Sequence, residues 1–109
     1  MTRRQLTPRQ VELVAERFKA LAEPSRLRIL QALRGGERTV TELMEATGFG
    51  QANLSKHLQV LHATGFVARR KAGVSVYYSL ADDDVLALCD LVCGRIEREL
   101  ADRRRALAR

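Results

Sequence analysis

The fold is decided by the stretch TVTELMEATGFGQANLSKHLQVLHATGFV, residues 39–67. Its first four residues have the spacing of a capping box, in which the Thr39 hydroxyl caps the amide of Glu42 and the glutamate side chain reaches back. This pattern predicts a short helix over residues 40–47. The GFG segment at 48–50 ends that helix, because glycine adopts backbone conformations that helical residues avoid.

A second helix is predicted over residues 51–63. Leucines recur at helical spacing and mark its buried stripe; they are Leu54, Leu58 and Leu61. At about 100° per residue, the side chains that point mostly away from this stripe are small or polar, with no acid among them. They are Ala52, Asn53, Ser55, Lys56 and Gln59. Two such helices joined by a glycine-containing turn predict a helix-turn-helix over residues 39–63.

After the second helix the pattern changes to that of strands. Residues 66–71 and 75–80 are rich in strand-forming residues and flank the turn AGV, which predicts a β-hairpin over residues 66–80. The first strand is basic and carries Arg69, Arg70 and Lys71. A helix-turn-helix followed by a basic hairpin predicts a winged helix-turn-helix.

The rest of the chain predicts three more helices, which makes the fold mainly α, with five helices and a β-hairpin wing. The first covers residues 8–22 and has a proline at its first position. The second carries the segment LRILQAL at 27–33. The last covers residues 82–106, and the three aspartates at its start complement the positive end of the helix. We expect a single domain over residues 1–109, since a chain of this length builds one core.

Composition and charge narrow the classes of function. With 46% apolar and 29% charged residues, the chain has the composition of a soluble globular protein. It shows neither an apolar run of about 18 residues nor a signal-peptide core, so we expect a cytoplasmic protein with no membrane partner. The net charge is +6, and the segment between Glu45 and Asp82 contains basic but no acidic residues. This distribution indicates a polyanionic partner.

Double-stranded DNA is the polyanion that the predicted fold suits. The major groove admits an α-helix, whose outer amides suit adenine and whose lysine can reach guanine or a phosphate. The candidate DNA-binding residues on this helix are Gln51, Ala52, Asn53, Ser55, Lys56, His57 and Gln59. Those on the hairpin, which would contact phosphates or enter a minor groove, are Arg69, Arg70 and Lys71. For His57 a structural role is the alternative to a phosphate contact.

Three segments resemble the ArsR/SmtB family of bacterial transcriptional repressors. They are LAEPSRLRILQAL at 21–33, the stretch at 39–67, and RKAGVSVYYSL at 70–80. The resemblance extends over residues 11–100, and its most specific part is QANLSKHLQVLHATGFV leading into GVSVYYSL. It implies a sequence-specific DNA-binding repressor that forms a homodimer through its first and last helices, binds an imperfect inverted repeat and is released by an effector.

The resemblance also implies where an effector would bind. One type of metal site in this family needs a cysteine on the first helix of the DNA-reading pair, where this chain has ELMEAT. Another needs histidine on the last helix, but both histidines, His57 and His62, fall on the predicted recognition helix. We therefore expect neither site. Some members bind trivalent arsenic or antimony through a cysteine pair on the last helix, and Cys89 and Cys93 form such a pair.

The residues themselves leave three roles open for Cys89 and Cys93. Two thiolates can span a soft or thiophilic ion. As(III) or Sb(III), the ions that the resemblance implies, would take a third sulfur from the partner subunit or a small thiol. A redox or persulfide response is the second role. The third is structural, since both cysteines lie on the apolar stripe of the last helix and free cysteine packs as a small hydrophobe. No obligatory cofactor is expected.

Other classes of protein are weaker alternatives. One is a MarR-type winged-helix regulator, which shares the predicted fold. Another is a small metal or thiol carrier, in which the basic residues would be only a solvated surface. An enzyme is not expected, because no histidine and carboxylate flank a nucleophile and no phosphate-cradling glycine loop occurs in the sequence.

Overall fold

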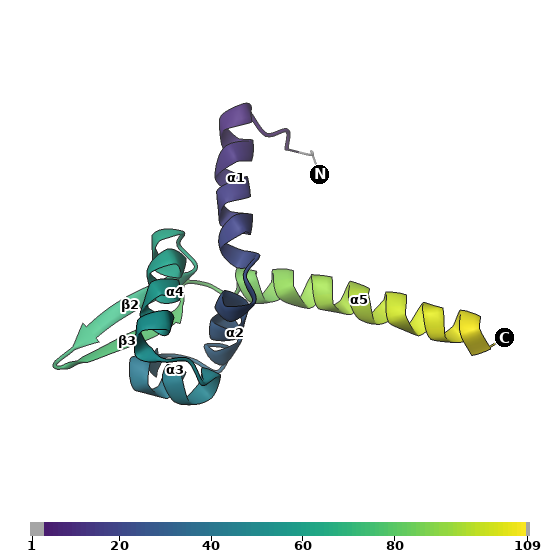
Figure 1. Ribbon diagram of the computed structural model, residues 1–109. Coiled ribbons are helices and arrows are strands. Elements are labelled where there is room, and N and C mark those ends of the chain that lie inside the picture. Colours follow the sequence, from purple (N-terminus) through teal and green to yellow (C-terminus); the bar gives the residue numbers. More distant parts are fainter. Residues whose placement is uncertain (1–3, 109) are drawn as a thin grey trace.

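Five helices and a small antiparallel sheet make up the computed structural model, which describes residues 4–108 (Figure 1). The elements in chain order are α1 (Pro8–Leu21), α2 (Pro24–Ala32), β1 (Arg38–Thr39), α3 (Val40–Thr47), α4 (Gln51–Ala63), β2 (Val67–Ala72), β3 (Ser75–Leu80) and α5 (Asp84–Ala108). The predicted mainly α fold with a hairpin wing is confirmed.

Capping boxes set where α1 and α3 begin. The Thr39 hydroxyl accepts from the Glu42 amide at 3.2 Å, and the Glu42 carboxylate accepts from the Thr39 amide at 2.9 Å, as the sequence predicted. Thr7 and Gln10 form a second box at the start of α1. Gly48 ends α3 with φ at 77°, the left-handed conformation that glycine adopts without strain.

The core lies between α2, α3, α4 and the start of α5. Its fully buried side chains are Ile29, Leu30, Leu33, Leu43, Leu54, Leu58 and Leu61. The leucines predicted as the buried stripe of α4 are all among them. Val85 and Leu86 pack against the same cluster, so the first turn of α5 is fixed to the core.

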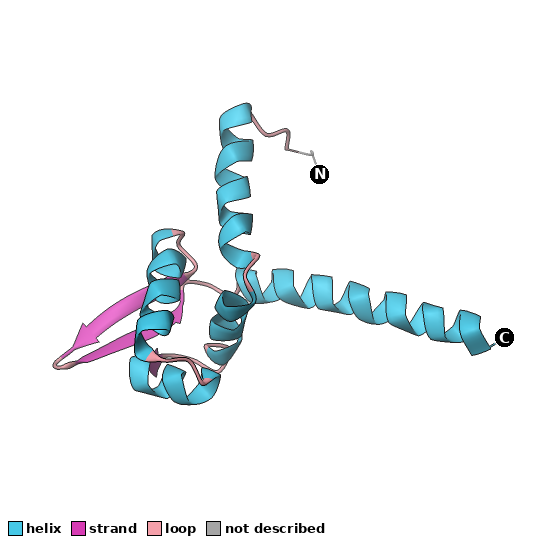
Figure 2. Ribbon diagram, in the orientation of Figure 1, coloured by secondary structure: helices cyan, strands magenta, loops and turns pink. Residues whose placement is uncertain are grey.

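The strand β1 was not predicted from the sequence. It pairs antiparallel with β3, which lies between β1 and β2, so the wing is a three-stranded sheet. Figure 2 shows its two long strands, β2 and β3. Thr39 is both the last residue of β1, where it pairs with Tyr77, and the N-cap of α3. The wing is therefore joined directly to the first helix of the helix-turn-helix.

Two helices, α1 and α5, extend away from this core in different directions (Figure 1). The radius of gyration is 17.2 Å, whereas a compact domain of this length has about 13 Å. Apolar side chains on both helices are exposed: Val11, Val14, Phe18, Val92, Ile96, Leu100 and Leu107. Across residues 4–108, no helix is long and apolar enough to span a membrane.

The last helix begins and ends two residues later than the predicted range of 82–106. Asp82 stays outside the helix because its Oδ1 accepts from the amide of Asp84 at 2.9 Å, which caps the first turn. The first helix ends at Leu21 rather than residue 22.

Candidate nucleic-acid interface

The outer face of α4 presents most of the predicted DNA-reading residues to solvent. Gln51, Ala52, Asn53, Ser55, Lys56 and Gln59 are all exposed. Gly50 occupies the N-cap and supplies no side-chain hydrogen bond, so no N-cap side chain occupies the first amides of α4. The helix can therefore offer both side chains and backbone donors to a neighbouring polyanion.

His57 does not share this exposed face. It is 6% exposed, and its Nδ1 accepts from Nε of Arg26 at 3.2 Å and lies 3.8 Å from the carboxylate of Glu23. A phosphate cannot reach a side chain that is enclosed and bonded in this way. The phosphate-contacting interpretation of His57 therefore conflicts with the structure, and the structural alternative fits.

The wing residues differ from one another in their contacts. Arg69 and Lys71 are exposed on β2. Arg70 is also exposed, but it donates from Nε and Nη2 to the Glu37 carboxylate at 3.0 and 2.7 Å and lies 4.6 Å from the centre of the Tyr77 ring. The hydrogen bond from Arg70 holds the pKa of Glu37 below its usual value. A phosphate that contacts Arg70 must therefore compete with Glu37.

Two recesses flank α4 where it meets the wing. One has a volume of about 290 Å³ and is lined by Thr39, Val40, Thr41, Gln51, Ser55, Val74, Ser75 and Val76. The other, of about 360 Å³, is lined by Ser55, Leu58, Gln59, His62, Arg69 and Tyr78. Of the hydroxyl groups in the first recess, that of Ser55 belongs to a predicted DNA-binding residue. Those of Thr39, Thr41 and Ser75 were not predicted for the interface, because threonine and serine in those positions also serve as cap and strand residues.

The cysteines lie in a separate apolar groove between α1, α2 and α5. The groove has a volume of about 600 Å³ and is lined by Phe18, Leu21, Ala22, Leu27, Leu88, Cys89, Val92, Cys93, Ile96 and Glu97. Cys89 is half-buried and Cys93 is exposed. The Cys93 sulfur lies 3.5 Å from Oε1 of Glu97, and this hydrogen bond raises the pKa of the Cys93 thiol. In the part of the chain that the structure describes, no group of three or more His, Cys, Asp or Glu residues is placed to hold a metal ion.

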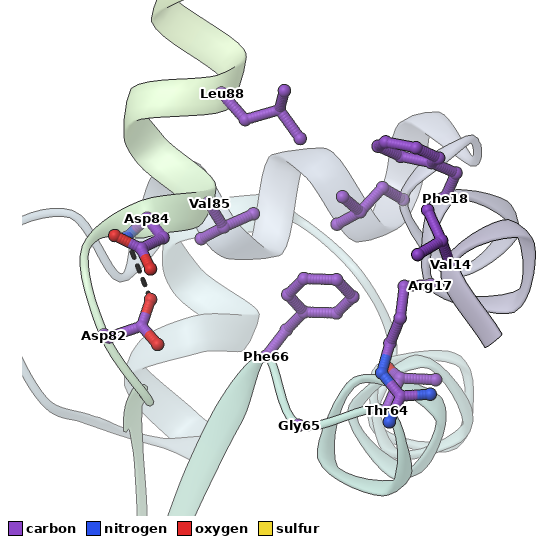
Figure 3. A pocket seen from close by; sticks show the side chains of 11 residues that line it. Val14, Arg17, Phe18, Thr64, Gly65, Phe66, Asp82, Asp84, Val85 and Leu88 are labelled. Carbon is purple, nitrogen blue, oxygen red and sulfur yellow. Dashed lines mark hydrogen bonds between the residues drawn. The ribbon is translucent and has the colours of Figure 1, made fainter. Parts of the chain in front are cut away.

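A smaller pocket of about 320 Å³ lies where α1, the turn between α4 and β2, and the start of α5 meet (Figure 3). Phe66 and Val85 line its apolar part, and Arg17 of α1 and Thr64 at the end of α4 also line it (Figure 3). Asp82 lines the opposite side. The end of α4 thus lies close to both projecting helices.

The fold and the exposed face of α4 define a winged helix-turn-helix protein. A protein-family model described as "Bacterial regulatory protein, arsR family" matches residues 23–69. Together with the relatives described next, this match shows that the chain belongs to the ArsR/SmtB family, as the resemblance implied.

Several relatives support this assignment. The uncharacterized HTH-type transcriptional regulator Rv0081 of Mycobacterium tuberculosis is 41% identical over 93 residues, which cover 84% of this chain and 82% of that protein. A transcriptional repressor SmtB homolog from Synechocystis is 40% identical over 88 residues, covering 81% and 67%. A probable mercury resistance operon repressor from Streptomyces lividans is 40% identical over 77 residues, covering 71% and 62%.

Solved structures of related proteins support the same family assignment. The crystal structure of M. tuberculosis Rv0081 superposes with a TM-score of 0.78 at 39% identity and covers 90% of this chain and 98% of that one. The solution structure of the homodimeric winged helix-turn-helix domain of Mb0332 from Mycobacterium bovis has a TM-score of 0.76 at 36% identity, covering 90% and 94%. These relatives are described as transcriptional regulators, in accordance with the expectation that the chain is not an enzyme.

Proposed function

We propose that this protein is a homodimeric transcriptional repressor that binds an inverted repeat in duplex DNA and is released by an effector, in the cytoplasm. The observation that carries the proposal is the exposed, acid-free outer face of α4 beside a basic wing. An α-helix fits the major groove, and the amides of Gln51 and Asn53 suit base edges there. Lys56 and the wing residues Arg69, Arg70 and Lys71 would supply phosphate contacts.

The exposed apolar side chains of α1 and α5 support the homodimer. The single chain exposes 8274 Å², while a compact monomer of its mass exposes about 6,000 Å². The excess of about 2,000 Å² on each chain corresponds to about 4,000 Å² for a pair of chains, which lies in the range that obligate homodimer interfaces bury. A second copy, packed through the same two helices, would cover Phe18, Val92 and Ile96 and hold two α4 helices at a fixed spacing.

The salt dependence of DNA binding tests the proposal. We expect the dimer to bind the promoter fragment of its own gene tightly at low salt, with the logarithm of the affinity falling linearly with the logarithm of salt concentration. An unrelated duplex of equal length is the control. Equal affinity for both duplexes at every salt concentration would contradict sequence-specific binding.

For the effector we propose a thiophilic ion, As(III) or Sb(III), bound by Cys89 and Cys93. The two residues are one helical turn apart, and both line a groove that opens to solvent. A relative named as a probable mercury resistance operon repressor supports ion sensing. Because this chain supplies two sulfurs, the third ligand of a pyramidal ion would come from the partner subunit or a small thiol. A redox or persulfide response and a structural role are the competing interpretations.

The effector proposal is tested by titrating ions onto the DNA complex. As(III) or Sb(III) should release the wild-type dimer, whereas Cys89→Ser and Cys93→Ser dimers should bind DNA but stay bound. Zn²⁺ is the control ion, because thiolate pairs alone do not make a complete zinc site. A wild-type complex that neither metalloid disturbs would exclude this effector and leave the repressor assignment intact.

A further inference from the structure

Two arginines of α2 hold the two helices of the helix-turn-helix. Arg28 donates from Nη2 to the carbonyl of Thr47 at 2.7 Å and lies 4.7 Å from the centre of the Phe49 ring, so it fixes the end of α3. Arg26 donates from Nε to Nδ1 of His57 at 3.2 Å and so holds α4. Among residues 4–108, this is the one side-chain hydrogen bond that joins α4 to another helix.

The same guanidinium group of Arg26 also reaches α1. Its Nη1 donates to the backbone carbonyl of Ala20, in the last turn of α1, at 3.2 Å. Ala20 is 3% exposed and Arg26 is half-buried, so this contact is partly shielded from solvent. The Arg26 backbone is itself fixed, since its amide donates to the capping carboxylate of Glu23 at 3.1 Å. One side chain therefore connects a helix of the proposed dimer interface with the proposed recognition helix.

The bond to His57 has a defined chemical requirement. Arginine only donates hydrogen bonds, so Nδ1 of His57 must carry a lone pair and the ring hydrogen must lie on Nε2. The charged groups that face Nδ1 are Arg26 and, at 3.8 Å, the carboxylate of Glu23. The ring is thus held in one tautomer, which gives the contact a spectroscopic signature.

We propose that Arg26 and His57 are positioning residues for DNA binding. By holding His57 and Ala20 at once, Arg26 fixes the tilt of α4 relative to α1 and carries a displacement of α1 to the recognition helix. A binding site needs its contacting groups held by supporting hydrogen bonds, because small misplacements lose the contacts. The inference rests on the proposed function and adds residues that do not touch DNA themselves.

A pair of His57 variants separates this role from plain core packing. In His57→Asn the amide oxygen can take the place of Nδ1 and accept from Arg26, whereas in His57→Gln it lies near the place of Nε2. We expect His57→Asn to bind the promoter fragment within about twofold of wild type, and His57→Gln and Arg26→Gln to bind about tenfold more weakly. Arg9→Gln, which removes the same charge from the exposed start of α1, is the control.

Two further measurements make the test decisive. Dimerisation, followed by analytical ultracentrifugation, should be unchanged in all these variants. In wild-type protein, long-range ¹H–¹⁵N NMR spectra should show His57 with its hydrogen on Nε2. Three results would each overturn the positioning role of Arg26 and His57. They are equal DNA affinity of the two His57 variants, a parallel loss of dimerisation, and a hydrogen on Nδ1 of His57. A wild-type protein that binds no DNA sequence-specifically would instead overturn the proposed function, whatever the tautomer.

Discussion

Lys56 is the basic side chain on the exposed face of α4. We expect Lys56→Ala to weaken DNA binding about equally for all sequences and to reduce the slope of log affinity against log salt by about 1, because one phosphate contact is lost. Fluorescence anisotropy at several salt concentrations measures both quantities. Lys19→Ala, which removes an equal charge from α1, should leave the slope unchanged. An unaltered slope in Lys56→Ala would mean that this side chain does not reach a phosphate.

The Cys93 thiol is exposed, but its hydrogen bond to Glu97 raises its pKa. At pH 7 to 8 less of the thiol is therefore ionised, and the thiolate is the reactive form. In protein diluted until the dimer dissociates, so that the groove is uncovered, we expect Glu97→Gln to lower the pKa and to speed alkylation of Cys93 by iodoacetamide severalfold. Mass spectrometry of the labelled peptide measures the rate, and Glu99→Gln, two residues further along α5, is the control. A rate that Glu97→Gln leaves unchanged would contradict the role of this carboxylate.

At the residue scale, the exposed face of α4 agrees with the predicted one, whereas the sequence left open whether His57 is structural or contacts a phosphate. The three leucines of the stripe locate its centre but not its width, and His57 lies within a turn of all of them. Its burial also depends on Arg26, which lies 31 residues away along the chain. Helical periodicity contains no information about such a partner. The spacing of apolar residues along α4 therefore could not predict that His57 is buried.

At the scale of elements, the ion pair between Glu37 and Arg70 joins the wing to the segment before β1. The pKa of Glu37 is lowered by its bond to Arg70, so the pair is complete at neutral pH and contributes stability above the pKa that Glu37 has in the unfolded chain. As the pH falls through the lowered folded-state pKa, the carboxylate is protonated and this contribution is lost.

Substitution of Glu37 tests whether the pair restrains the wing. We expect Glu37→Gln to raise DNA affinity about threefold, because a negative charge is removed and Arg70 is released toward the phosphates. Filter binding at constant salt and neutral pH measures the change. Glu12→Gln in α1, which removes an equal charge from another exposed ion pair, should have little effect. Weaker binding by Glu37→Gln would show that Arg70 works best when it is held in place.

Helix boundaries could be predicted where a local capping pattern sets them. The range of α3 agrees with its prediction because Thr39 and Glu42 lie within the same turn. The strand β1 could not be predicted, since two residues leave no periodic pattern and its pairing partner Tyr77 lies far along the chain. The link between the wing and α3 is therefore a product of tertiary structure.

At the scale of the whole molecule, the apolar groove of α5 is expected to be the dimer seam. Val92→Glu should produce monomers that no longer bind the promoter fragment specifically, because two recognition helices must be held together on an inverted repeat. Light scattering after size exclusion measures the mass. Leu91→Glu is the matched control, since Leu91 is 71% exposed and does not line the groove. A dimeric Val92→Glu protein would place the interface elsewhere.

The length of α5 has a consequence for solution behaviour. Its 25 residues extend about 37 Å, and from residue 95 onward every described side chain is exposed in the single chain. Helical segments without tertiary contacts are only marginally stable in water. The outer turns of α5 should therefore fray in dilute solution and become ordered when chains associate. The mean residue ellipticity at 222 nm should then become more negative as the protein concentration increases along the dimerisation curve, so that helix content reports the association of chains.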